Sequence, residues 1–534
     1  MKKNIITCFL FILLIAIFIS CSKDDEIENP PVTKPDDEKV EDPPVTNPDE
    51  EDNEGPRYEY YIGSLFGFDK SVRTGSLGNS ENTTLYNLPL FSPPNTEEEW
   101  WDNLVEEFVY SGMDYAMANL RGILPDPKKY TDHGDPNRVK YLVDAIERLG
   151  VSDKLKIAIF DDCPASWAAA RNLDLYGSYA SNLTEHPYPV DQLDGDGGIY
   201  KYIWDYNLKI AFQNIPDKYL FKYKDRPVIF FWSVNNFLNS SGSNNYNGKL
   251  SKILKRIRAD FQEDFGSDPF IIVDKSFYDR DNTVYYPVTD AINNWFTMNE
   301  PYTVRVHNGV RVGVAIPGFS INDKKGNKMF VDAKHGNTLD KALDDLVIAK
   351  SDIILIEGFT DVRENAALWR STDNKYYDYP NQRINIVRRY SNDPYPNEFK
   401  VEAEGCDFYY DNTAGNNGGV FRKGDLDVKK CTDIYGGWCI TNTDDGEWLQ
   451  WKELPIREKT STFKIRYASN QTAKICFNVD GVDGATIELP NSNKEWKTIN
   501  AGTIDFEKKA LHDVILKIVS GNIDINYFII VAAE

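Results

Sequence analysis

The chain has 534 residues, enough for two or three domains, and 41% of them are apolar, which permits sizeable hydrophobic cores. Its formal net charge of -23 argues against nucleic acid as a partner, because a phosphate backbone needs cationic residues to neutralise it. The five histidines leave little for a Ser-His-Asp triad, and no HExxH or paired-histidine spacing predicts a catalytic metal.

Residues 1–20 have the pattern of an export signal: Lys2 and Lys3 precede a mostly apolar run, which is short for a membrane span. The run ends in Phe18-Ile-Ser-Cys21, which resembles a bacterial lipobox; the resemblance implies lipidation of Cys21. The acidic residues that follow resemble the signal that sends Bacteroidetes lipoproteins to the outer face of the outer membrane. The alternative is an ordinary cleaved signal with an incidental cysteine.

Residues 21–56 are expected to form a disordered tether. From Asp24 to Pro56, acidic residues outnumber lysines by fourteen to two, and two copies of a Pro-Pro-Val-Thr unit recur. Proline stiffens such a segment and like charges extend it. A tether from a membrane to a globular body is the plain physical interpretation.

Residues 57–396 alternate apolar runs of strand length with amphipathic helical stretches. The predicted strands are 58–65, 114–120, 156–160, 227–232, 270–273, 288–292, 310–316 and 353–356. The predicted helices are 97–111, 139–149, 200–215, 249–265, 339–349 and 383–389. Such alternation predicts parallel strands with helical crossovers, and a (β/α)8 TIM-type barrel is the economical α/β fold. A doubly wound sheet is the alternative, but no glycine-rich phosphate loop follows the first strand.

Polar and aromatic side chains follow several of these strands, and in a barrel the strand ends share one face. We therefore interpret them as substrate-binding candidates. A helix N-cap is the alternative for each aspartate, because Asp is a favoured cap. The candidates are Arg121, Asp161, Asp162, Trp232, Asp274 and Trp295.

The eighth predicted strand leads directly into three acids, Glu357, Asp361 and Glu364, before the pattern turns helical from Asn365 to Trp369. Glycoside hydrolysis needs two carboxyl groups, one to protonate the leaving oxygen and one to activate water or attack. These three are the candidate catalytic residues. The alternative is that Glu364 lies in the first turn of a helix, where a negative charge suits the dipole.

Phe359 to Asn365 can be aligned with a Trp-Asn-Glu-Trp-x-Glu-Gly motif. On this ground the barrel resembles the bacterial domain of unknown function 5010, a relative of glycoside hydrolase families 71 and 99. The resemblance implies a base-like Asp361, a proton donor Glu364, and action on a complex, mannan-type polysaccharide. Phe359, Thr360 and Asp361 depart from the motif, and Glu357 offers another way to pair the acids.

Residues 397–534 consist of short alternating segments separated by Gly and Asn pairs, which is typical of an all-β sandwich. This part resembles family 6 and family 35 carbohydrate-binding modules, which implies a jelly-roll sandwich. The resemblance rests on Val401 to Glu404, Gly418-Gly419 with Arg422, 436–438, 446–449, Glu495-Trp496 and 525–527.

The resemblance implies a structural Ca²⁺ bound by Glu402, Glu404 and Asn526, with Asp524 in reserve, and sugar contacts from Trp438 and Trp496. A sandwich that binds nothing is the alternative. Four cysteines also lie in this part of the chain and allow two disulfides in three connectivities. They are Cys406, Cys431, Cys439 and Cys476.

Together these patterns predict a monomeric, surface-anchored lipoprotein that hydrolyses a polysaccharide, while the sandwich holds the polymer near the barrel. No cofactor is expected in the barrel. A glycan-binding protein without catalysis is the competing hypothesis, and a structural surface protein is a third.

Overall fold

The computed structural model describes residues 59–77, 84–92, 96–122, 134–162, 200, 203–234, 248–295, 304–322, 328–434 and 436–533. The export signal, Cys21 and the tether lie outside these residues. Within the described part of the chain, no helix combines the length and apolar character needed to cross a membrane.

Eight parallel strands form the body of the first part of the chain, and each coincides with a predicted strand to within a few residues. Their order in the sheet is β7-β6-β5-β3-β2-β1-β12-β9, which follows the order of the chain around a ring. The strands are β1 (Tyr61–Phe66), β2 (Tyr115–Leu120), β3 (Lys156–Asp162), β5 (Arg226–Trp232), β6 (Phe270–Asp274), β7 (Ala291–Asn293), β9 (Val310–Ala315) and β12 (Ile353–Ile356).

The sheet is mixed, because β4 (Lys222–Tyr223) and β8 (Arg305–His307) pair antiparallel to β5 and β9. β7 and β9 lie beside each other without a ladder between them in the described residues, so the sheet curls into a nearly closed barrel. The eight parallel strands follow the order expected for a (β/α)8 TIM-type barrel, but the structure does not confirm a fully closed barrel.

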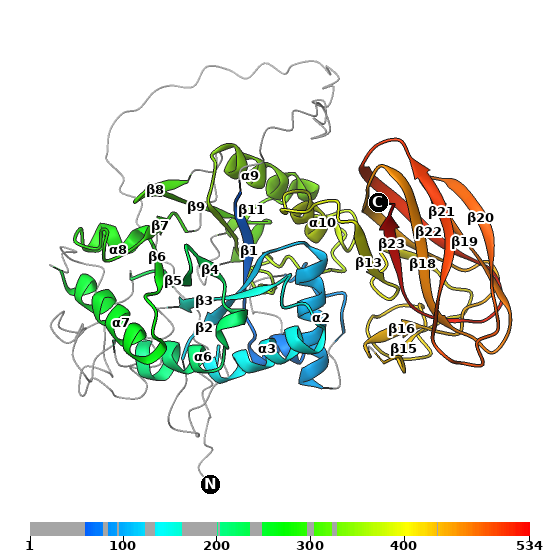
Figure 1. Ribbon diagram of the computed structural model, residues 1–534, viewed down its shortest axis with the longest axis horizontal. Coiled ribbons are helices and arrows are strands. Elements are labelled where there is room, and N and C mark those ends of the chain that lie inside the picture. The colour runs from blue at the N-terminus through cyan, green and yellow to red at the C-terminus, as the bar shows by residue number, and fades with distance from the viewer. Residues whose placement is uncertain are drawn as a thin grey trace, which may run out of the picture.

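Helices cover the outside of this barrel (Figure 1). The capping box of Thr96 and Glu99 starts α2, and its apolar side buries Trp101, Leu104 and Phe108 against the sheet. The helices are α1 (Lys70–Arg73), α2 (Glu97–Tyr110), α3 (Val139–Arg148), η4 (Trp204–Leu208), α6 (Lys209–Gln213), α7 (Lys249–Phe265), α8 (Lys275–Arg280), α9 (Asn337–Ile348) and α10 (Gln382–Arg389). Single 3-10 turns are η1 (Pro136–Arg138), η5 (Asp217–Tyr219) and η6 (Lys334–Gly336).

The helix predicted from Asn365 to Trp369 is wrong, because this segment is irregular. Asn365 has φ 51°, a left-handed conformation that ends right-handed helical structure. Its side-chain amide donates to the carbonyls of Thr84 and Ser320 and accepts from the Tyr86 N–H. These distant partners fix a loop at a position where local propensity favours a helix.

Residues 398–532 form a sandwich of two antiparallel sheets, as predicted. One sheet has the order β15-β16-β23-β18-β21, with β13 also paired to β23, and the other has the order β14-β17-β22-β19-β20. Trp451, Phe463, Phe477 and Phe528 pack between them. The strands are β13 (Glu398–Glu402), β14 (Phe408–Tyr410), β15 (Val428–Lys430), β16 (Trp438–Ile440), β17 (Trp448–Ile456), β18 (Lys459–Ala468), β19 (Ala473–Val479), β20 (Val482–Leu489), β21 (Lys497–Phe506), β22 (Ala510–Ser520) and β23 (Asp524–Ala532).

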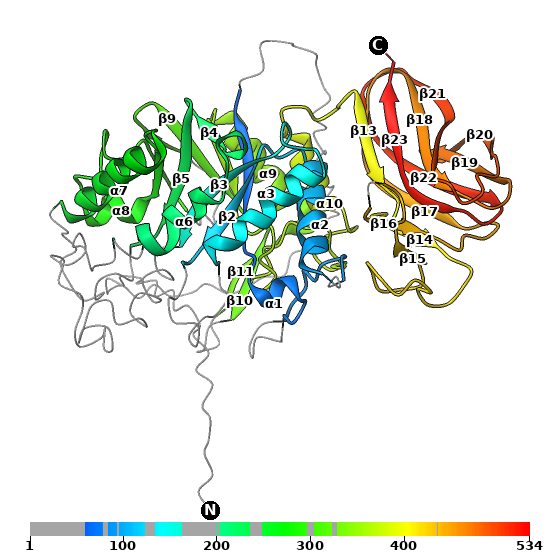
Figure 2. The same cartoon turned by 60° about the horizontal axis from the view of Figure 1, so that its bottom comes forward.

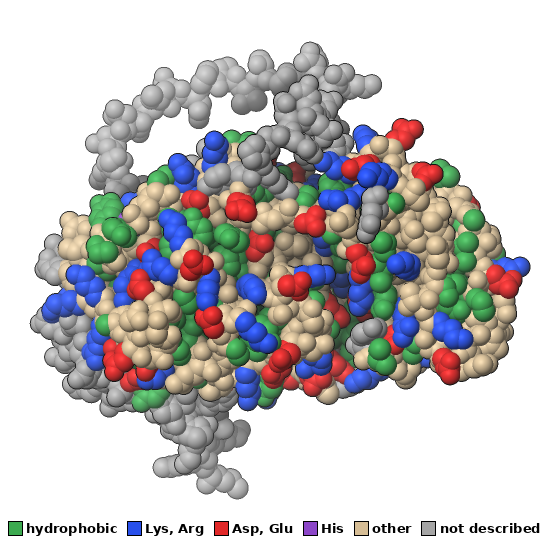
Figure 3. Space-filling model, in the orientation of Figure 1, with side chains coloured by type: hydrophobic (Ala, Val, Ile, Leu, Met, Phe, Trp, Pro, Cys, Tyr) green, Lys and Arg blue, Asp and Glu red, His purple; other side chains and the backbone are tan. Residues whose placement is uncertain are grey.

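The barrel and the sandwich share an aromatic and polar interface. Tyr110 of α2 lies 5.2 Å from Phe399 of β13, ring centre to ring centre, and the Arg388 guanidinium lies over both rings. Asn381 donates its side-chain amide to Asp407 at 2.8 Å. On the face shown in Figure 3, acidic and basic side chains are interspersed over both parts.

Candidate functional site

The side chains that point into the barrel follow the two-residue alternation of its strands. Met117, Phe160, Phe230 and Ile272 belong to one buried cluster inside the barrel, together with Leu355 of β12. Two residues further along the same faces lie Asn119, Asp162, Trp232, Asp274 and Glu357. These residues are at the end where the parallel strands finish, and Figure 2 shows α1 and the hairpin of β10 (Phe319–Asn322) and β11 (Lys328–Val331) at this end.

The backbone after β12 is held firmly on both sides. The N–H of Glu357 donates to the carbonyl of Ala315 at 2.9 Å, and the N–H of Phe359 donates to the carbonyl of Leu65 at 2.7 Å. Gly358 has φ 88°, and a Cβ there would lie 2.6 Å from the carbonyl oxygen of Ala366, so a side chain is excluded. This bracing gives the acids that follow a defined position.

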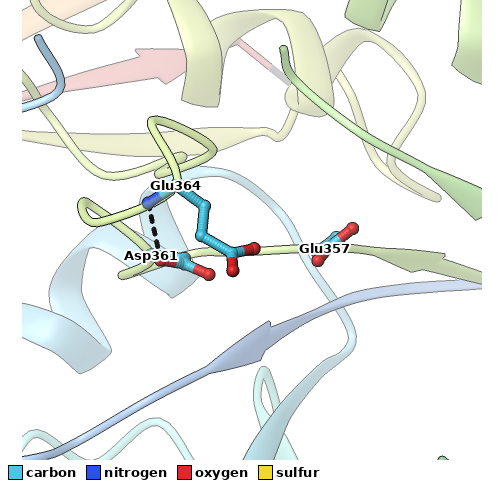
Figure 4. A group of neighbouring side chains, drawn as sticks. All are labelled: Glu357, Asp361 and Glu364. Carbon is cyan, nitrogen blue, oxygen red and sulfur yellow. Dashed lines mark hydrogen bonds between the residues drawn. The ribbon is translucent and has the colours of Figure 1, made fainter. Parts of the chain in front are cut away.

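Glu357, Asp361 and Glu364 come together at the barrel mouth. Each offers one carboxylate oxygen, and these oxygens all lie within 4.8 Å of one another. The Glu364 carboxyl lies between the other two (Figure 4), and the Glu364 N–H donates to Asp361 Oδ1 at 3.2 Å. Glu357 is only 6% exposed, and its Oε2 has no hydrogen-bond partner among the described residues.

The three acids differ in how readily they ionise. Burial raises the pKa of Glu357 well above its usual range, and the carboxylates of Glu364 and Asp361 raise it further. Burial and the neighbouring Asp361 likewise raise the pKa of Glu364. Burial also raises the pKa of Asp361, but the Glu364 N–H and the Arg121 guanidinium oppose that rise. Asp361 is therefore the member of the cluster that best tolerates a negative charge.

Arg121 lies beside this cluster and is paired with other acids. Its Nε is 2.9 Å from Asp162 Oδ2, and its NH1 is 3.7 Å from Asp69 Oδ2. The structure thus brings Arg121 and Asp162 to the mouth, as predicted.

Asp161 points the other way, since adjacent strand residues face opposite sides. It is fully buried and accepts a hydrogen bond from Asn207 Nδ2 at 2.6 Å. The expectation that Asp161 contacts substrate therefore needs correction, because its side chain ties β3 to the outer layer.

Trp232 and Trp295 form an aromatic wall of the mouth. Their ring centres are 6.3 Å apart, and both rings lie near Phe160, at 6.4 and 5.1 Å. Asp274 lies at the same level as Trp232, accepts a hydrogen bond from Ser276 Oγ at 2.5 Å, and has a pKa that burial raises to about 6. Aromatic faces beside carboxyl groups suit a sugar, whose C–H faces stack on rings.

The sandwich places its two predicted sugar contacts differently. Trp438 is 4% exposed, and its ring packs on Phe91 of the barrel part at 6.0 Å and on Phe421 at 6.2 Å. The prediction that Trp438 stacks on a sugar needs correction, because the ring is covered by these neighbours at the interface. Trp496 is half-buried, so part of its ring is accessible. Its Nε1 donates a hydrogen bond to Thr432 Oγ1 at 3.0 Å.

The residues predicted to bind Ca²⁺ in the sandwich fit an ion only in part. Glu404 is 2% exposed, and its Oε2 has no hydrogen-bond partner among the described residues. Burial raises its pKa well above the usual range, and Glu402 raises it further. However, Glu402 is paired with Lys400, and the Asn526 side chain donates to Asp433 at 3.0 Å. Glu404 therefore offers an unpaired oxygen to a cation, whereas Glu402 and the Asn526 amide are engaged by other side chains.

The four cysteines of the sandwich are buried free thiols in this structure. Cys431 directly follows β15, and Cys439 lies on β16, the strand paired with β15. The side-chain interaction between these two thiols lowers the pKa of Cys431 and raises that of Cys439.

Residues 58–408 match the family described as "Domain of unknown function (DUF5010)". The chain belongs to this family. Residues 422–530 of this DUF5010 protein match "Carbohydrate binding module (family 35)". No curated protein matches the chain.

Several solved structures similar to about a quarter of this DUF5010 protein are carbohydrate-binding modules. One is the C-terminal CBM6 of LamC from Zobellia galactanivorans, with 18% identity, TM-score 0.21, and 25% of this chain and 99% of that chain covered. Another is CsCBM6-3 from Clostridium stercorarium in complex with cellobiose, with 15% identity and a TM-score of 0.20. The match covers 25% of this chain and 94% of that chain. CBM6cm-2 of Cellvibrio mixtus lichenase 5A, in complex with cellotriose, has 20% identity, TM-score 0.21, and 26% and 98% covered.

One mouth residue was not among the predicted candidates. Asn119 lies on the lumen side of β2, and its Oδ1 is buried without a hydrogen-bond partner among the described residues. The alternation Tyr115, Met117, Asn119 along a predicted strand is the signal that could have identified it. A neutral amide with an unpaired oxygen is suited to receive a hydroxyl group of a ligand.

Proposed function

We propose that this DUF5010 protein is a glycoside hydrolase that acts on a complex polysaccharide from a TIM-type (β/α)8 barrel. The observation that carries the proposal is the group of Glu357, Asp361 and Glu364 within 4.8 Å at the mouth of the barrel. An aromatic wall of two tryptophans beside it supplies the stacking faces that sugars need. The family 35 match supports a carbohydrate ligand for the chain as a whole.

The proposed roles follow from the different pKa shifts. Glu364, whose pKa is raised, keeps a proton and donates it to the leaving oxygen. Asp361 tolerates the negative charge and assists attack at the anomeric carbon. Inverting enzymes separate their carboxyl groups by roughly 6.5–9.5 Å to admit a water, whereas retaining enzymes use about 5–5.5 Å. The close spacing here favours retention of configuration.

The competing function is glycan binding without hydrolysis, and two observations favour it. Phe359, at the position of the motif's tryptophan, is 0% exposed and stacks on Phe108 with ring centres 3.9 Å apart. Thr360, at the position of the motif's asparagine, accepts from the Gly67 N–H and donates to the Gly67 carbonyl. Both residues serve the fold rather than a ligand.

Release of reducing ends from a panel of mannans, glucans and xylans distinguishes the two functions. Hydrolysis that disappears in Asp361→Asn and Glu364→Gln supports the enzyme. Glu147→Gln serves as the matched control, because Glu147 is an exposed acid at the end of α3. Tight binding of a glycan without any product after long incubation would reject hydrolysis and leave the binding function.

We further propose that the protein is anchored through lipidated Cys21 on the outer face of the outer membrane, as a monomer. The sandwich would hold the polymer near the barrel through Trp496, and a Ca²⁺ ion on Glu402 and Glu404 would stabilise it. Metabolic labelling with a radioactive fatty acid tests the anchor, since a Cys21→Ser variant should take up no label. Protease accessibility of intact cells tests the surface location.

A further inference from the structure

The spacing of the three mouth carboxylates has a consequence beyond acid–base chemistry. Their oxygens lie within 4.8 Å of one another. Ca²⁺ binds oxygen ligands at about 2.3–2.6 Å, so two ligands of one ion are at most about 4.6–5.2 Å apart. Glu357, Asp361 and Glu364 can therefore reach one ion of this size together.

Glu357 provides an observation that is independent of this spacing. Its carboxyl is more than nine-tenths buried, and Oε2 receives no hydrogen bond from any residue that the structure describes. In Figure 4 the Glu364 carboxyl lies between the Glu357 carboxyl and the Asp361 carboxyl. A buried carboxylate oxygen without a donor is unfavourable unless a cation or a ligand meets it.

The protein's own cations do not fill this place. Arg121 is engaged by Asp162 and Asp69. In the described ranges, no lysine or arginine forms an ion pair with Glu357, Asp361 or Glu364. Asp361 and Glu364 therefore share the charge of Arg121 with Asp162 and Asp69, and the lumen contains the further unpaired oxygen of Asn119.

We propose that Glu357, Asp361 and Glu364 bind one Ca²⁺ ion at the mouth of the barrel. Hard oxygen ligands and a flexible coordination number make Ca²⁺ the best match among common divalent cations. An ion bound by Glu364 replaces the proton that this residue needs as a donor, so the Ca²⁺-loaded state does not hydrolyse glycans. That consequence rests on the proposed function, whereas the ion site does not.

The test titrates the full mature chain with Ca²⁺ by isothermal titration calorimetry at pH 7.5, after treatment with EDTA. The Glu402→Gln/Glu404→Gln background removes any ion bound by the sandwich. In this background we expect one Ca²⁺ per chain, a loss of affinity of at least tenfold in Glu357→Gln, and an unchanged affinity in Glu147→Gln. Tb³⁺ luminescence excited through tryptophan provides a second readout, since Trp232 and Trp295 line the same mouth.

Two results would overturn the site: no ion bound at millimolar Ca²⁺ in the Glu402→Gln/Glu404→Gln background, or equal affinity in Glu357→Gln. If Glu357→Gln does not fold, Asp361→Asn makes the same comparison. Ca²⁺ binding, together with no hydrolysis of any glycan in EDTA-treated, Ca²⁺-free buffer, would retain the ion site and reject the enzyme. Hydrolysis that is independent of Ca²⁺, with no bound ion, would support the enzyme and reject the ion site.

Discussion

Two groups of buried and half-buried carboxylates differ in which cations the chain places beside them. At the barrel mouth, Glu357, Asp361 and Glu364 converge, and the nearby Arg121 is engaged by Asp162. At the interface between barrel and sandwich, the Glu402 carboxylate raises the pKa of both Glu106 and Glu404, but Lys400 pairs with Glu402.

The Arg370 guanidinium adds a second cation to the interface group and lowers the pKa of both Glu106 and Glu107 against the rise caused by burial. Glu107 also accepts hydrogen bonds from the Arg370 N–H at 2.8 Å and from Asn103 at 2.9 Å. Charges that the chain compensates itself are typical of structure. The mouth acids share the single charge of Arg121, which already pairs with Asp162 and Asp69, and this shortage of positive charge points to a ligand.

The sharpest test of this difference is removal of one mouth carboxyl. Glu364→Gln should lower kcat on a susceptible glycan about 10²–10⁴-fold, because general acid catalysis contributes that much. Steady-state release of reducing ends measures the change. Glu404→Gln at the interface should leave kcat within about twofold, and an equal loss in both variants would remove the distinction between the two groups.

The interface group should dominate stability instead. Arg370 is 3% exposed, donates from Nε to Asn381 at 2.8 Å, and lies over the Tyr110 ring. Arg370→Met should lower the free energy of unfolding by roughly 3 kcal/mol, since it leaves buried acids without their cation. Urea denaturation followed by tryptophan fluorescence measures this loss. Arg148→Met, at an exposed ion pair, should cost less than about 1 kcal/mol.

Neutralising Glu357 should raise the free energy of unfolding, whereas Arg370→Met should lower it. Its pKa is raised in the folded state because the buried carboxyl ionises less readily than in the unfolded chain. The folded protein is therefore most stable, with respect to this group, below the unfolded pKa, and it loses this stability as pH rises through the folded pKa. Each unit of this rise corresponds to about 1.4 kcal/mol. In Ca²⁺-free buffer, Glu357→Gln should therefore melt at a higher temperature than the natural protein at pH 8, and the difference should shrink towards pH 4.5. Equal melting curves at both pH values would contradict this expectation.

The sequence predicts the barrel strands and the position of the mouth acids well, because apolar runs and their order are local signals. Strand alternation also distinguishes Asp162 from Asp161, a distinction that the list of strand ends did not make. Trp438 and Asn365 could not be predicted in the same way. Their surroundings are set by Phe91, Thr84 and Ser320, which are distant in sequence and meet them only in the folded chain.

The smallest expected effect concerns Glu106 of α2. Burial and the Glu402 carboxylate raise its pKa to about 8, against the opposing charges of Lys400 and Arg370. Because the folded pKa exceeds the unfolded one, Glu106 stabilises the interface most at low pH, and this contribution fades as pH rises from about 4.5 to about 8.

Amide hydrogen exchange in α2 and β13 should therefore quicken modestly between pH 6 and pH 9, after correction for the intrinsic exchange rate. Glu106→Gln should remove most of that pH dependence, because its side chain no longer ionises. If exchange in the Glu106→Gln variant keeps the full pH dependence, the titrating group lies elsewhere and the two cations already neutralise the interface completely.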